Sequence, residues 1–162
     1  MSKQLAVEPL TGESFAAFGE VLENKTAVRR RDFKLQFATD NGPRLWVNRI
    51  NRLEENPVRV QEMECHPHSA QTFVPMQPGR CLVVVALSGS DGKIDLSSMR
   101  AFLSSGGQGV TYRPHVWHYT FSSMDGPNEV AVIMGYTGRD DDTALIQLET
   151  PVEVRLTTAQ EA

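Results

Sequence analysis

Glycine and proline interrupt this chain so often that only short elements fit between them. The 162 residues include 12 glycines and nine prolines, and the apolar stretches that they bound are brief. Short apolar runs bounded by turn residues predict β-strands. The expected strands cover residues 44–50, 58–66, 72–76, 81–87, 101–103, 109–112, 115–121, 129–136 and 152–156.

The run over residues 81–87 is apolar on both faces, which predicts a central strand that is buried on both sides. One short helix is expected near the start of the chain. Thr11 or Ser14 would cap it, residues 15–18 would pack inward, and Gly19 would end it. An all-β barrel or jelly roll with a few short helices follows, because closure removes exposed sheet edges.

Composition predicts one ordinary globular domain over residues 1–162. Hydrophobic residues make up 40% and charged residues 22% of the chain. The net charge of −4 argues against a nucleic-acid-binding protein, which needs a basic face. The cluster Arg29-Arg30-Arg31 is short and precedes Asp32, so it is interpreted as a solvated loop or a subunit contact.

Targeting and redox features point to the cytoplasm. The first residues lack an apolar signal segment, and no stretch of sequence approaches the length of a membrane span. Cys65 and Cys81 do not form a CxxC pair and are expected to be reduced thiols. These features favour a cytoplasmic protein that acts on a small molecule, with no nucleic-acid or membrane partner.

The segment after residue 58 mixes core-like and polar residues on one face. Alternation along a strand puts these side chains together: Val58, Val60, Glu62, Glu64, His66 and His68. Either a bulge switches the face, or the strand runs from the core into a polar cavity. The simpler alternative leaves Glu62 and Glu64 in water.

All four histidines lie in two segments. His66 and His68 form an HxH pair that could share one cation or one substrate, although such pairs are common on surfaces. In the second segment His118 is expected on the opposite face from His115 and Trp117. His118 is either a core histidine bound to a carbonyl or a functional group, and the clustering favours the second.

The HxH pair, a glycine-bounded strand and the later His118 together resemble the two cupin motifs. The resemblance implies a double-stranded β-helix barrel in which three histidines and a carboxylate hold a metal. Gln71 stands near the expected carboxylate, and a neutral amide does not neutralise a cation. We therefore expect no required cofactor, although a divalent ion such as nickel could bind His66, His68 and His118 weakly.

Three blocks of residues, in order and spacing, resemble the ureidoglycolate lyase family. They contain Glu62, Glu64, His66, Pro67, Gln71, Phe73, Pro75 and Met76; then Asp95, Leu96, Ser97, Arg100, Ala101 and Phe102; then Gly109, Val110, Tyr112, Trp117 and His118. The resemblance implies a homodimeric, cupin-like lyase that splits (S)-ureidoglycolate into glyoxylate and urea in allantoin and purine breakdown.

The implied substrate is a hemiaminal, whose collapse needs a base for the hydroxyl proton and an acid for the departing nitrogen. His118 and His66 are expected to transfer protons, and Glu64 to orient or tune a histidine. Arg100 is a candidate carboxylate clamp, because guanidinium binds with two prongs, and Arg49 is a weaker one. The remaining expected substrate contacts are Gln71, Tyr112, Glu62 and Trp117.

Other functions stay open at this point. A cupin oxygenase or isomerase would hold a metal through His66, His68 and His118, and a ligand-binding module would have no catalysis. A hydrolase of the same substrate would release ammonia instead of urea. The stretch Gly106-Gly107-Gln108-Gly109 is interpreted as a turn rather than a phosphate-binding loop.

Overall fold

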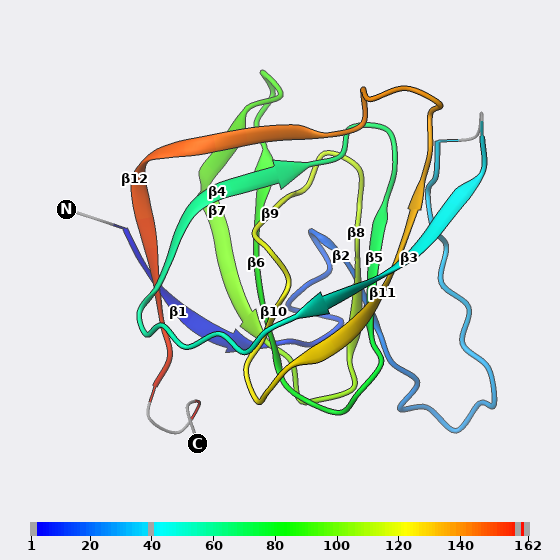
Figure 1. The fold of residues 1–162 in the computed structure, drawn as a ribbon, viewed down its shortest axis with the longest axis horizontal. Helices are drawn as coiled ribbons and strands as arrows, with labels where there is room; N and C mark the ends of the chain where they lie inside the picture. The colour runs from blue at the N-terminus through cyan, green and yellow to red at the C-terminus, as the bar shows by residue number, and fades with distance from the viewer. Residues whose placement is uncertain (1–2, 39–40, 158–159, 161–162) are drawn as a thin grey trace.

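Two β-sheets lie side by side in a computed structural model that describes residues 3–38, 41–157 and 160 (Figure 1). In the part of the chain that the structure describes, no helix has the length and apolar character to cross a membrane. The strands are β1 (Gln4–Pro9), β2 (Gly19–Leu22), β3 (Pro43–Ile50), β4 (Val58–Cys65), β5 (Gln71–Pro75), β6 (Cys81–Ser88), β7 (Ile94–Leu103), β8 (Gly109–Tyr112), β9 (Trp117–His118), β10 (Ser122–Ser123), β11 (Asn128–Gly135) and β12 (Ala144–Arg155).

The larger sheet has the order β10-β6-β7-β1-β12-β4-β9, and β6 also pairs with β9. This extra pairing closes six strands into a ring around one apolar core, whose members include Val60, Met63, Val84, Trp117 and Val154. The second sheet has the order β2-β8-β5-β11-β3. A second core lies between this sheet and the ring, with members that include Phe15, Phe73, Val85, Phe102 and Val132.

Strand β6 contributes to both cores. Val83 and Val85 belong to the core between the sheets, whereas Leu82 and Val84 belong to the core inside the ring. All residues from Cys81 to Ala86 are therefore inaccessible to solvent, which confirms the predicted doubly buried strand.

The chain crosses repeatedly between the sheets. Strands β3, β5, β8 and β11 belong to one sheet, and β4, β6, β9 and β12 belong to the other. This crossing is typical of jelly-roll and double-stranded β-helix barrels. The predicted all-β, cupin-like barrel is confirmed.

The predicted N-terminal helix is wrong, because residues 3–38 and 41–157 contain no helix. Thr11 and Ser14 do cap each other's backbone N–H groups, and Phe15 and Phe18 are buried, but the segment forms only turns. Gly19 then starts β2 directly against β8. A Cβ atom on Gly19 would lie 1.8 Å from the carbonyl oxygen of Thr111, so the glycine is needed for close strand packing.

Several strand ends differ from the predicted ones. Strands β7 and β12 extend well before residues 101 and 152, and β1 and β2 were not predicted. Only Trp117–His118 of the predicted strand 115–121 forms a strand, β9, and β10 follows at Ser122–Ser123. His115 before β9 has a positive φ of 65°. Cys65 and Cys81 are buried in different cores and form no disulfide.

Candidate active site

Glu64, His66 and His118 meet in the space between the two sheets. Glu64 of β4 is the register partner of His118 of β9. Its Oε1 lies 3.6 Å from His118 Nδ1 and 3.9 Å from His66 Nε2. The two imidazole ring centres are 5.3 Å apart. One carboxylate is therefore flanked by two imidazoles.

A change of face within β4 places Glu64 there. Val60 and Met63 both point into the core of the ring, whereas Gln61 and Glu62 between them are both exposed. The partner strand β12 shifts its register opposite this point. Of the two alternatives left by the sequence, the structure has the bulge-like switch, which places Glu62 and Glu64 on the opposite side of β4 from Val58 and Val60.

The tautomer of His66 follows from its partner. His66 Nδ1 lies 2.6 Å from the carbonyl oxygen of Asp142, and a carbonyl only accepts hydrogen bonds. His66 Nδ1 therefore carries a proton and donates it to Asp142. When the ring is neutral, the lone pair of Nε2 faces Glu64, and this buried atom has no other partner among the described residues.

His118 is held by aromatic rings and not by hydrogen bonds. Its side chain is 1% exposed, its ring stacks on Tyr112 at 4.4 Å between centres, and Phe73 approaches edge-on. Within the described residues neither ring nitrogen has a hydrogen-bond partner. Burial, with the adjacent His66 as a second cause, lowers the pKa of His118 to about 3. His118 is therefore a neutral imidazole near pH 7.

Glu64 links this cluster to a cavity. Burial raises the pKa of Glu64 above its ordinary value, although the adjacent His66 opposes the shift. The cavity has a volume of about 260 Å³, which suits a small molecule. Its lining consists of Trp46, Asn48, Ile50, Glu64, Gln71, Phe73, Thr120, Phe121 and Val130.

Two more predicted residues lie beside the cluster. Gln71 lines the cavity, and its Oε1 is buried without a partner among the described residues. The hydroxyl of Tyr112 is also buried and unpartnered there, beneath His118. Burial raises the pKa of Tyr112, so the phenol stays protonated. Unpartnered buried polar atoms are costly, and a polar ligand would satisfy them.

Arg100 and Trp117 are not brought to the cavity. Both Arg100 Nε and Nη2 donate to the carboxylate of Glu8, and Nη1 donates to the carbonyl of Ser14. Trp117 points into the ring, on the other side of β9 from His118, and its Nε1 donates to Ser88 Oγ. The expected carboxylate clamp at Arg100 therefore has a carboxylate of the chain itself as its partner.

Glu62 and His68 also lie apart from the cluster. Glu62 is exposed and accepts a hydrogen bond from Gln147. His68 is exposed, and its backbone N–H donates to Asp142 Oδ1. The HxH pair does not share one face, because β4 ends at Cys65 and the period of two ends with it.

The cluster offers a metal a different set of ligands from the predicted one. One ligand atom each from Glu64, His66 and His118 lies within 4.8 Å of the others. Two buried imidazoles, each with an unpartnered ring nitrogen among the described residues, and a carboxylate suit divalent zinc or nickel. These three residues therefore fit a metal, with Glu64 in the place expected for His68.

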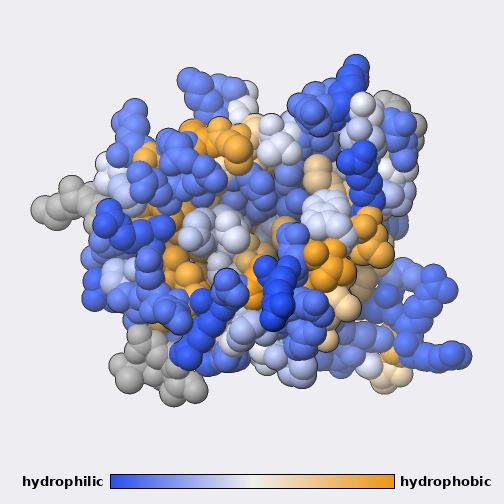
Figure 2. Space-filling model, in the orientation of Figure 1, coloured by the Kyte–Doolittle hydropathy of each residue, from blue (hydrophilic) through white to orange (hydrophobic). Residues whose placement is uncertain are grey.

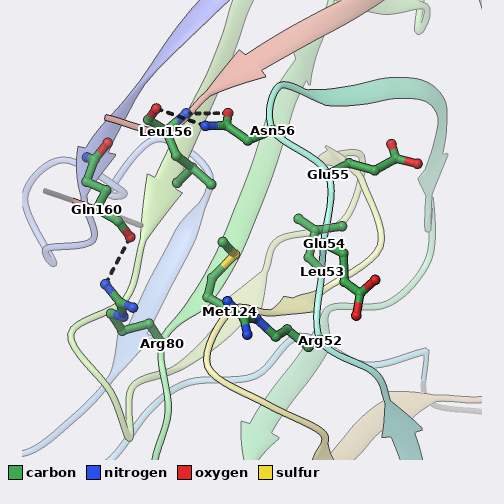
Figure 3. A pocket seen from close by; sticks show the side chains of 9 residues that line it. All are labelled: Arg52, Leu53, Glu54, Glu55, Asn56, Arg80, Met124, Leu156 and Gln160. Atoms are coloured by element: carbon green, nitrogen blue, oxygen red, sulfur yellow. Dashed lines mark hydrogen bonds between the residues drawn. The ribbon is translucent and has the colours of Figure 1, made fainter. Parts of the chain in front are cut away.

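A larger cavity lies elsewhere, at the end of the ring near Leu156, and has a volume of about 390 Å³ (Figure 3). Two of its polar side chains pair with the chain itself, since Arg80 donates to the carbonyl of Gln160 and Asn56 bonds both backbone groups of Leu156. Its other charged side chains are Arg52, Glu54 and Glu55, and no imidazole is among the described residues that line it.

The sequence did not indicate Trp46, Asn48 or Asp142. Trp46 and Asn48 alternate along an expected strand and therefore share one face, and in the structure that face lines the cavity. This alternation was the sequence signal that could have indicated them. Asp142 lies in a run of three aspartates that is typical of a solvated loop. Its carbonyl reaches His66 only because β11 and β12 bring residue 142 beside the end of β4.

These features make this chain a cupin-like β-barrel protein with a carboxylate and two imidazoles beside a small cavity. Its family follows from the sequence as a whole. The profile of the ureidoglycolate lyase family matches residues 2–155, and the chain belongs to that family.

Named relatives agree with this membership. A ureidoglycolate lyase of Burkholderia mallei (strain NCTC 10229) is 35% identical over 150 residues, which are 85% of this chain and 86% of that protein. A ureidoglycolate lyase of Escherichia coli O1:K1 is 37% identical over 134 residues, covering 72% and 78%. Among solved structures, a dTDP sugar isomerase of Desulfovibrio desulfuricans G20 aligns with a TM-score of 0.48 at 14% identity, covering 82% of this chain and 83% of that one.

Proposed function

We propose that this protein is a ureidoglycolate lyase, which cleaves the C–N bond of (S)-ureidoglycolate to give glyoxylate and urea. Family membership supports this reaction. The observation that carries it is the position of Glu64, which lines a small cavity and contacts two buried imidazoles behind it. Such a group can remove and return protons without a nucleophile or a redox cofactor.

The proposed reaction begins with removal of the hydroxyl proton. Glu64 takes this proton, because it alone of the three residues lines the cavity. The oxygen electron pair forms the aldehyde C=O bond of glyoxylate, and the C–N bond breaks toward nitrogen. The departing urea nitrogen then needs a proton, which the same cluster returns.

The two adjacent imidazoles behind Glu64 exchange the proton with it. His66 presents the lone pair of Nε2 to Glu64 and is the resting acceptor. His118 has a low pKa, so it holds a proton only briefly and is a strong acid when it does. His118 therefore returns the proton readily to Glu64, which lines the cavity and passes it to the poorly basic ureido nitrogen.

Gln71 and Tyr112 are proposed to hold the ureido group. The free Oε1 of Gln71 accepts a hydrogen bond from the NH₂ of the ureido group, and the protonated hydroxyl of Tyr112 donates to its carbonyl. A divalent ion bound by Glu64, His66 and His118 would supply polarisation of a substrate oxygen.

We further propose a homodimer in the cytoplasm, acting in allantoin breakdown. The outer face of the second sheet supports a partner, because Leu45 and Val47 of the edge strand β3 are 69% and 52% exposed. Val74 pairs through β11 with Val47 and extends this apolar face. Figure 2 shows apolar side chains at the surface on this side of the molecule. Pairing two copies on this side would also cover β3, because an uncovered edge strand favours aggregation.

Product analysis tests the proposed reaction. Purified protein incubated with racemic ureidoglycolate is expected to release glyoxylate and urea in equal amounts, without ammonia, and to stop at half consumption. Samples with EDTA and with added nickel measure the contribution of a metal. Ammonia formed in place of urea would show a hydrolase, and a rate equal to spontaneous decay would show that the protein is not this enzyme.

A further inference from the structure

The cavity beside Glu64 lacks a positive charge for the carboxylate of the substrate. Among the described residues that line it, Glu64 is the only charged side chain. A substrate carboxylate placed near it would be repelled, and burying an unpaired charge is costly. Arg100 cannot fill this role where it lies, because Glu8 already binds its guanidinium.

Arg44 lies beside this cavity on the inner face of β3. Arg44, Trp46 and Asn48 alternate along the strand and share that face. Trp46 lines the cavity of Glu64 and also an adjoining cavity of about 200 Å³. Arg44 lines the adjoining cavity, so the two cavities meet at Trp46.

Sheet register places Arg44 in line with the proposed ureido site. Gln71 pairs with Met134, and Met134 pairs with Arg44, so Gln71 and Arg44 are two strands apart. Their backbones are thus roughly 10 Å from each other. The guanidinium carbon of Arg44 lies 3.1 Å from the ring centre of Tyr136. Since Tyr136 follows the end of β11, the strand between β3 and β5, this stacking holds the guanidinium on the β11 side of β3.

Among the described residues, no carboxylate pairs with the charge of Arg44. No carboxylate of the described residues lies within 4.0 Å of its guanidinium. In the same adjoining cavity, Arg139 pairs with Asp141 at 3.1 Å, and Asp142 Oδ1 accepts the N–H of His68. Asp140 also lines this cavity. Arg44 is therefore the arginine there with its donors available to an added anion.

We propose that Arg44 binds the carboxylate of the substrate and so selects 2-hydroxy-2-ureido acids. This inference rests on the proposed lyase function. The ureido group lies at Gln71, the reacting carbon lies against Glu64, and the carboxylate extends past Trp46 to the guanidinium. The fork of two N–H donors matches the two carboxylate oxygens.

The test compares two substrates in matched variants. N-(hydroxymethyl)urea is the same hemiaminal with hydrogen in place of the carboxylate. Arg44→Gln is expected to lower kcat/KM for ureidoglycolate by about 10- to 100-fold, the usual effect of losing a charge-assisted hydrogen bond, and to leave N-(hydroxymethyl)urea unaffected. Inhibition by glyoxylate should weaken in parallel. Arg49→Gln, on the opposite face of β3, is the control and should change neither substrate.

The outcomes separate this inference from the proposed function. If the wild-type protein does not cleave ureidoglycolate, the lyase function fails, and the role of Arg44 fails with it. If the wild-type protein cleaves it but Arg44→Gln keeps its kcat/KM and its glyoxylate inhibition, only the role of Arg44 is overturned. An equal loss for both substrates would also overturn it. Arg44→Lys, which keeps the charge, should retain part of the activity, and unchanged melting of each variant excludes misfolding.

Discussion

Replacing His118 with glutamine is expected to lower the turnover of ureidoglycolate by about two to four powers of ten. One general acid–base group usually contributes this much, and an amide cannot take and return a proton. His118 contacts Glu64 and is buried from solvent, so water cannot easily replace it. The measurement is kcat for glyoxylate release, with EDTA present in parallel samples.

His115→Gln is the matched control for this prediction. His115 is three residues away and exposed, and its backbone N–H rather than its ring binds the carbonyl of His66. Its substitution should change turnover less than about threefold, as is usual for a surface position. Near-normal activity of His118→Gln, with loss of activity in His115→Gln, would move the catalytic group to the other side of β9.

Replacing Glu64 with glutamine should lower kcat/KM by about two to four powers of ten, because the proposed base is lost while the side-chain shape is kept. In the wild-type protein, kcat/KM should fall as the pH decreases through the pKa of Glu64. Burial raises that pKa, so the decrease should begin above the ordinary value of 4.5. The residual activity of Glu64→Gln should lack this decrease.

Glu62→Gln tests whether Glu64, and not its neighbour on the same side of β4, is the reacting carboxylate. Glu62 is two residues from Glu64 and carries the same charge, but it is exposed and bonded to Gln147. Its substitution should leave kcat/KM at neutral pH nearly unchanged and should move the decrease at low pH slightly downward, because the charge of Glu62 helps to raise the pKa of Glu64. If Glu62→Gln abolished activity and Glu64→Gln did not, the reacting carboxylate would be Glu62, and the assignment to the cluster would be wrong.

The local pattern of apolar and turn residues in the sequence was sufficient to predict most strands of the barrel. The apolar run over residues 81–87 could only be a strand buried on both sides, and it is the wall between the two cores. Residues 109–112 are bounded by glycine and proline, and they form β8 with the predicted ends. Strand β1 was missed because its stability comes from parallel pairing with β7 and β12, which are far away in the sequence.

The face on which a site residue lies could be predicted where its strand keeps the alternation of side chains, and could not be predicted where the strand ends or is irregular. His118 faces the space between the sheets as its neighbours indicated. His68 does not join His66, because β4 ends first. Arg100 and Arg44 cannot be ranked from sequence, since the choice depends on which arginine finds a carboxylate in the fold. Only long-range contact brings Glu8 to Arg100 and leaves Arg44 beside the cavity.

A crystal structure of the protein soaked with glyoxylate tests most directly whether the cluster of Glu64, His66 and His118 is the site of cleavage. The product should occupy the 260 Å³ cavity, with its aldehyde oxygen within hydrogen-bond distance of Glu64 and its carboxylate directed toward Arg44. Glyoxylate bound only in the larger cavity beside Arg52 and Arg80, with the smaller cavity free of it, would contradict the assignment of the active site.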